Sequence, residues 1–183
     1  KADAEEVLAA IGAPAKVQIL RGAPDWWHPG RHGKICLGPK KVLAIFGELH
    51  PKVLREMDIK GPAVGFTIWP DDVPTPKNKT TTRSALVATD LQAVERDFAF
   101  VVDAEGEALT LVNAAAGADK GLITDVRVFD EFVGGSLGDG KKSLAVTVRM
   151  QPTVATLKDA EIEAVSAKIV EKVTKATGGT LRG

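Results

Sequence analysis

The sequence contains no tyrosine, a single cysteine and no excess of either charge, and each scarcity excludes something. Cys36 alone cannot form a disulfide within the chain, so we expect a protein of a reducing compartment, the cytoplasm. No apolar run approaches the roughly 20 residues of a membrane-spanning helix. Residues 1–6 are too acidic and too short of hydrophobic side chains for a signal peptide, so we expect no association with a membrane.

The balance of charge limits how the chain could bind nucleic acid. Twenty-four basic side chains face 24 acidic ones, with a balance of +3 in residues 1–91 and −3 in residues 92–183. A protein that holds nucleic acid by backbone charge alone is usually basic. We therefore expect no binding to DNA, and any RNA must be bound by a local surface through a few specific contacts.

A change of composition divides the chain. Residues 70–84 contain three prolines followed by a polar, threonine-rich run, which is typical of an extended linker. We predict one domain or partial domain over residues 1–88 and a second domain over residues 89–183. The composition as a whole, 44% hydrophobic and 26% charged, is that of ordinary globular protein.

The first part has the pattern of a mixed α/β module. Asp3 is placed to cap a first helix and Gly12 to end it. One helix and four short strands, with a second short helix as a candidate, give this part little core of its own, so we expect it to belong to a larger module. The helices are predicted at residues 4–11 and 51–57, and the strands at residues 16–20, 33–37, 42–46 and 64–69.

The residue pattern of the second part predicts the order strand, helix, strand, strand, helix, strand, which is the ferredoxin-like arrangement of an α+β fold. Thr156 is a candidate N-cap for the last helix, with Asp159 three residues later in a capping-box-like pattern. A glycine-rich loop at residues 134–140 is suited to a hairpin. The strands are predicted at 97–103, 123–133, 143–150 and 180–182, and the helices at 108–118 and 157–177.

Each predicted helix has an apolar stripe to bury, so both helices should cover the same face of the sheet. For the last helix the stripe is Ile162, Val165, Ile169 and Val173. Alternation then assigns Phe98, Phe100, Leu144, Val146, Val148 and Met150 to the core. We call the helix-free face of this sheet the open face, and alternation places Ala99, Val101, Ser143, Ala145, Thr147 and Arg149 on it.

Asp130 and Phe132 lie two residues apart on one predicted strand, so they point to the same side. If that side is the open face, an aromatic ring stands among small residues beside a carboxylate and the hydroxyl of Ser143. Such a surface suits an unpaired base, which stacks on the ring while polar groups bond its edge. The competing interpretations are that Phe132 is a core residue and that Asp130 only begins a turn.

Four stretches in the second part resemble, in order and spacing, the anticodon-binding domain at the end of the β subunit of bacterial phenylalanyl-tRNA synthetase. The first part also resembles that subunit, in motifs from the end of its synthetase-like module. The stretches are residues 96–102, 128–132, 140–145 and 156–157 with the terminal Leu181-Arg182, and the motifs are residues 28–31 and 46–51.

The resemblance implies an α2β2 ligase that joins phenylalanine to tRNA(Phe) with ATP and magnesium. It implies that the α subunit holds the active site, so this chain should carry no catalytic residue, no cofactor and no metal. It also implies anticodon contacts at Ala99, Asp130, Phe132, Ser143 and Ala145. To these we add nearby basic residues, Lys141, Lys142 and Arg149, as candidate RNA-binding residues.

One departure from the family concerns the ring. The family often has tyrosine where this chain has Phe132, and no tyrosine occurs anywhere in the sequence. Stacking survives that change, but a hydrogen bond through a phenol does not.

Other patterns were weighed against this interpretation. His28, His32 and Cys36 could indicate zinc by spacing, but Pro29-Gly30 would break a helix that grouped them, and we predict a turn at residues 28–31. His50-Pro51 is expected to set a strand-to-helix turn.

Two rival functions follow from the fold. One is a protein-interaction module that only assembles the oligomer. The other is a small-molecule regulatory domain or an acylphosphatase-like domain. An acylphosphatase needs an arginine in the loop after its first strand, whereas residues 104–107 supply two acids there.

Overall fold

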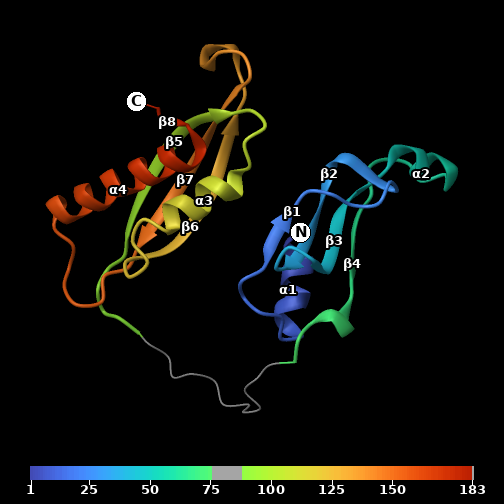
Figure 1. Cartoon of the computed structure of the whole chain (residues 1–183), viewed down its shortest axis with the longest axis horizontal. Helices are drawn as coiled ribbons and strands as arrows, with labels where there is room; N and C mark the ends of the chain where they lie inside the picture. Colours follow the sequence, from blue (N-terminus) through green and yellow to red (C-terminus); the bar gives the residue numbers. More distant parts are fainter. Residues whose placement is uncertain (76–87, 183) are drawn as a thin grey trace. The chain divides into compact units, whose positions relative to one another are not determined.

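The computed structural model describes residues 1–75 and 88–182, which form two compact units, Lys1–Arg83 and Ser84–Gly183 (Figure 1). Most of the predicted linker, residues 76–87, lies outside the described residues. The predicted boundary at residue 88 therefore stays a prediction. Among the helices of the described ranges, none combines the length and apolar character that crossing a bilayer requires.

The first unit is a four-stranded antiparallel sheet with one helix packed on it. Leu8 of helix α1 is buried against Ile35 and Leu43, which form the centre of a small core. The strands follow one another in the sheet in chain order, and the bounds of the elements are α1 Ala2–Ala10, β1 Gln18–Leu20, β2 Trp27–Leu37, β3 Lys41–Leu49, α2 Pro51–Glu56, β4 Val64–Ile68 and η1 Pro70–Asp72.

Two predictions for this unit are wrong. Helix α1 begins at Ala2, so Asp3 lies in its first turn and does not cap it, although a carboxylate there still complements the helix dipole. Residues 28–31 do not form a turn but lie within β2, where the pairing with β3 shifts register between Trp27 and His32. A strand irregularity accommodates Pro29 and Gly30 without reversing the chain.

His50 and Pro51 behave as predicted. His50 is the N-cap of α2, and its Nδ1 atom accepts a hydrogen bond of 3.0 Å from the backbone N–H of Lys52. Pro51 occupies the first turn, where a missing N–H costs nothing.

The second unit has the predicted order of elements and the ferredoxin-like fold. Its sheet has the order β6-β7-β5-β8, and every neighbouring pair is antiparallel. The two long central strands β5 and β7 therefore lie side by side, and the short β8 closes one edge (Figure 1). The bounds are β5 Val94–Asp103, α3 Ala108–Ala116, β6 Ile123–Phe132, η2 Gly135–Leu137, β7 Lys141–Met150, α4 Asp159–Thr177 and β8 Thr180–Leu181.

The core of this unit confirms the alternation. Both helices bury their stripes against one face of the sheet, Leu111 and Ala115 from α3 and the predicted four residues from α4. Phe98 is only partly buried and stacks on Phe100, with the ring centroids 6.2 Å apart. The other predicted core residues of β5 and β7 are fully or almost fully buried, namely Phe100, Leu144, Val146, Val148 and Met150.

The predicted N-cap of the last helix is wrong. Helix α4 begins at Asp159, two residues after the predicted start, so Thr156 lies before it. The Glu161 carboxylate accepts a hydrogen bond of 2.8 Å from the backbone N–H of Lys158. Glu161, at the third helical position, is therefore the acid of the capping box, and the predicted pair of Thr156 and Asp159 is not.

Candidate RNA-binding face

A bulge in β6 decides where Asp130 and Phe132 point. Before it, Val128 pairs with the core residue Val146, and after it Asp130 pairs with Ala145, so Phe129 has no partner in the register. Because antiparallel partners share a face, the extra residue turns Asp130 and Phe132 to the open face. A strand without the bulge would have turned both toward the helices.

The register of β5, β6 and β7 places the candidate residues in rows across the open face. Ser143 lies between Val101 and Phe132 in one row. Ala145 lies between Ala99 and Asp130 in the next row. Five residues named from the sequence, Ala99, Asp130, Phe132, Ser143 and Ala145, thus occupy two adjacent rows, which form a floor of small side chains with a ring and a carboxylate along one edge.

The ring is not sealed in the core. Phe132 is 43% exposed, and the backbone of Gly134 lies close against its outer edge. Asp130 is exposed as well. The interpretation of Phe132 as a core residue is therefore wrong, and a flat ligand has access to the ring.

The open face is less open along its middle than alternation implies. Ser143 is 4% exposed and Thr147 is 8% exposed, although no helix covers them. Both lie on the central strand β7, so longer side chains on β5 and β6 flank them, as Phe132 does for Ser143. Thr147 also donates a hydrogen bond of 2.7 Å from Oγ1 to Oδ1 of Asp97.

Of the three basic candidates, only Lys141 lies beside this floor, in the row of the open face next to Ser143. Lys141 forms an ion pair of 2.6 Å with Asp103. Lys142 pairs with Glu131 at 3.3 Å, and it alternates with Ser143, so it lies on the opposite side of β7. Arg149 is exposed on the open face but six residues from Ser143 along β7, roughly 20 Å away.

Sequence reasoning missed one cation at this floor. The backbone N–H of Arg182 donates a hydrogen bond of 2.7 Å to the carbonyl oxygen of Ala99, which continues the pairing of β8 with β5. Its guanidinium carbon lies over the Phe132 ring, 5.8 Å from the centroid. The terminal strand was predicted, and extending its register by one residue would have placed Arg182 beside Ala99.

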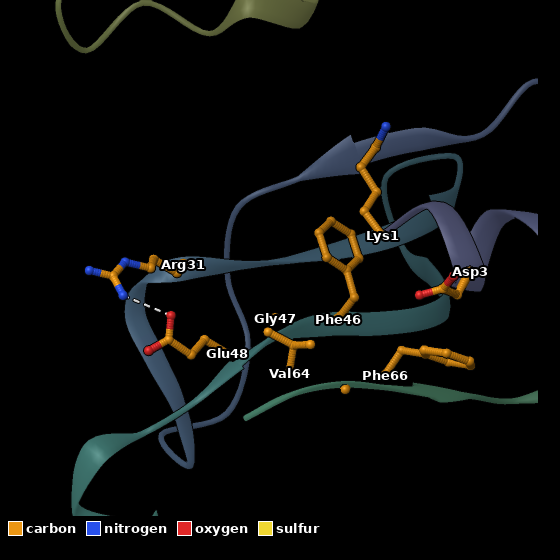
Figure 2. Close-up of a pocket in the computed structure, with 9 residues that line it drawn as sticks. Lys1, Asp3, Arg31, Phe46, Gly47, Glu48, Val64 and Phe66 are labelled. Carbon is orange, nitrogen blue, oxygen red and sulfur yellow. Dashed lines mark hydrogen bonds and ion pairs between the residues drawn. The ribbon is translucent and has the colours of Figure 1, made fainter. Parts of the chain in front are cut away.

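The first unit has a hollow of its own, of about 470 Å³, drawn in Figure 2. Phe46, Val64 and Phe66 give it an apolar wall. At its rim, Arg31 and Glu48 form an ion pair of 2.7 Å, marked by the dashed line. An apolar wall with a paired rim is suited to packing against protein.

Comparison with known proteins agrees with this geometry. Residues 89–182 match the family model described as "Ferredoxin-fold anticodon binding domain". Residues 1–69 match the model described as "Phenylalanyl tRNA synthetase beta chain CLM domain". The chain belongs to the phenylalanyl-tRNA synthetase β-subunit family.

Relatives within this family align over the whole chain. A protein of Ruegeria pomeroyi is 78% identical over 183 residues, one of Cereibacter sphaeroides 71% over 187, and one of Mesorhizobium japonicum 55% over 185. Each is named phenylalanine–tRNA ligase beta subunit. The chain spans 23% of the length of each of these relatives.

Proposed function

We propose that the second unit binds the anticodon stem-loop of tRNA(Phe) on its open face. It thereby supports the ATP-dependent joining of phenylalanine to tRNA(Phe) by a phenylalanine–tRNA ligase whose α subunit carries out the chemistry. The observation that carries the proposal is the exposed Phe132 ring beside the small-residue floor of Ala99 and Ala145.

The physical basis is the shape and chemistry of an unpaired nucleotide. A base is flat and apolar on its faces, and it bears hydrogen-bonding groups on its edge. The floor leaves room for the base, Phe132 offers a stacking surface, and the Asp130 carboxylate accepts hydrogen bonds from the edge. Stacking on an aromatic ring contributes about 1–3 kcal/mol per base.

The charges of the open face fit recognition by such contacts. Three consecutive rows, from Ala145 to Arg149 of β7, carry four acids of β5 and β6 and two basic residues, Arg127 and Arg149. A face with more acids than bases is not suited to holding phosphates by charge alone. The acids are Glu95, Asp97, Asp125 and Asp130.

The test is binding of the 183-residue chain to a tRNA(Phe) anticodon stem-loop, measured by fluorescence anisotropy, with anticodon-substituted loops for comparison. Phe132→Ala and Asp130→Ala should each weaken binding of the cognate loop by roughly tenfold or more. Phe129→Ala is the matched control, because Phe129 is exposed on the same strand but falls at the bulge, outside the paired rows.

Two results would contradict the proposal. Equal binding of cognate and substituted loops would refute reading of the anticodon. Unchanged RNA binding in both variants, together with altered assembly, would favour the protein-interaction module.

The first unit has a different proposed role, contact with protein. Val64 of the edge strand β4 is 81% exposed, and Trp26 and Met57 are also largely exposed. A contiguous exposed apolar patch marks an interaction surface, and Val64 lines one hollow with the exposed Phe66 (Figure 2). We assign this unit to packing within the longer β subunit and against the α subunit of an α2β2 enzyme in the cytoplasm.

ATP and Mg²⁺ belong to the proposed activity of the whole enzyme. Within residues 1–75 and 88–182, no three His, Cys, Asp or Glu side chains gather closely enough to hold a metal ion. The residues present thus do not fit such a site, and we assign no step to this chain that runs through ATP or Mg²⁺.

A further inference from the structure

Arg182 lies on the open face in the same row as Ala99 and Ala145. Leu181 pairs with Phe100, and the N–H of Arg182 bonds the carbonyl of Ala99, so the next register position puts Arg182 beside Ala99. Antiparallel partners share a face, so its side chain leaves the sheet on the side away from the helices. Arg182 therefore borders the floor on the edge opposite to Asp130.

The side chain crosses the floor toward Phe132. Strands β5 and β7 separate β8 from β6, a span of roughly 14 Å between strand axes. The guanidinium carbon nevertheless lies 5.8 Å from the Phe132 centroid, so the two side chains reach toward each other above the alanines. Larger residues than Ala99 and Ala145 would obstruct that crossing.

The distance between these two groups is close to what a base requires. Carbon atoms in contact lie about 3.5–4.0 Å apart, so a flat ring between two flat groups needs roughly 7 Å between them. The present 5.8 Å is about 1 Å too short, which a change of one arginine torsion supplies. A guanidinium is planar and stacks on aromatic faces, whereas an ammonium does not.

We propose that Arg182 forms the second wall of the base-binding site, so that an unpaired anticodon-loop base inserts between its guanidinium and the Phe132 ring. This inference rests on the proposed function and adds a residue to it. Arg182 acts by stacking and not as a point charge for a phosphate. The guanidinium lies over the Phe132 ring, on the side of the open face.

The test measures the affinity of the 183-residue chain for the tRNA(Phe) anticodon stem-loop. It compares Arg182→Ala, Arg182→Lys, Phe132→Ala and the double variant Phe132→Ala/Arg182→Ala with the parent. Arg182→Ala should weaken binding roughly tenfold. Arg182→Lys should weaken it by a similar factor, because lysine keeps the charge but loses the plane. The double variant should bind no more than about twofold weaker than Phe132→Ala, because both residues hold the same base.

Controls separate stacking from charge and from folding. Lys168→Ala removes one exposed positive charge from α4, on the helix side, and should leave binding unchanged. The thermal midpoint of Arg182→Ala should match the parent, because the bond to Ala99 comes from the backbone. The slope of log K against log salt should also stay the same, whereas loss of one phosphate contact would reduce it by about 0.7.

The inference and the proposed function fail in different ways. If Phe132→Ala weakens binding and Arg182→Ala does not, Arg182 is not the second wall of the site, and the proposed function stands. Full affinity in Arg182→Lys, a reduced salt slope in Arg182→Ala, or tighter binding in Arg182→Ala would each overturn the inference. If neither Phe132→Ala nor Arg182→Ala weakens binding, both proposals fall.

Discussion

The backbone of Gly134 supports the ring of Phe132 from its edge. A Cβ atom added at Gly134 would lie 2.5 Å from Cζ and 2.8 Å from Cε1 of that ring, closer than real contacts allow. The φ of Gly134 is −167°, an extended conformation open to any residue, so only the contact with the ring disfavours a side chain there. The position of the ring therefore depends on a glycine two residues away.

We predict that Gly134→Ala displaces Phe132 and weakens binding of the anticodon stem-loop by roughly tenfold, a loss of about 1.4 kcal/mol. The expected change in thermal stability is small, because the ring lies at the surface. Anisotropy titration gives the affinity, and a thermal melt gives the stability.

Gly135→Ala is the matched control, since a Cβ added there would meet nothing within 4 Å. It should bind as the parent does. Equal affinity in both glycine variants would show that the position of the ring does not matter.

The floor gives a second prediction, at Ala145. Ala145 pairs with Ala99 on one side and Asp130 on the other, in the middle of the space assigned to the base. Ala145→Leu should fill that space and weaken binding by at least about tenfold, while the melting temperature stays close to that of the parent. Ala164→Leu, on an exposed position of α4, makes the same chemical change on the helix side and should bind normally. Normal binding by Ala145→Leu would place the base elsewhere.

Periodicity predicts the core of the second unit because its cause is simple. A strand with one buried face alternates, and a helix on that face has an apolar stripe, so Phe100 and Ile169 could both be assigned to the core. The rows at the candidate site were harder to predict from the sequence, because the bulge in β6 moves every later residue of that strand to the other face. The spacing of Asp130 and Phe132 is the same for either face, so only the register decided between them.

Caps and irregular strands were predicted less well. Thr156 and Asp3 have good cap chemistry, but α1 begins at Ala2 without a side-chain cap, and at α4 the Glu161 carboxylate accepts from the N–H of Lys158. Pro29 and Gly30 have strong turn propensity, yet they lie within β2, in the register shift between the paired residues Trp27 and His32. Arg182 could not be found as a candidate from the sequence, because its contact with Phe132 crosses two intervening strands, β5 and β7.

The division into two units gives a third prediction, on stability. Ile169 is fully buried in the core of the second unit, and the first unit has a separate core. Ile169→Ala should lower the free energy of unfolding of the second unit by about 2–5 kcal/mol, through lost burial and the cavity left behind. Hydrogen exchange resolved by residue should show faster exchange in residues 88–182 and unchanged protection in residues 1–75.

The neighbouring Lys168→Ala is exposed and serves as the control, with an expected change within about 0.5 kcal/mol. A loss of protection in both units of Ile169→Ala would show that they unfold as one body.

The salt dependence of binding tests the kind of recognition proposed here. Within the described residues the register places four basic side chains on the open face, and Lys141 is paired with Asp103, which leaves Arg127, Arg149 and Arg182 for phosphates. Each phosphate neutralised on a single strand contributes about −0.7 to the slope of log K against log salt. At most three phosphate contacts limit the slope to about −2, and stacking of Arg182 on a base brings the expected slope closer to −1.

Titrations at four salt concentrations measure this slope, and Arg149→Ala is expected to change it by no more than about 0.7. A slope of −4 or steeper would mean that the chain holds RNA mainly by its phosphates, which a face with more acids than bases does not support.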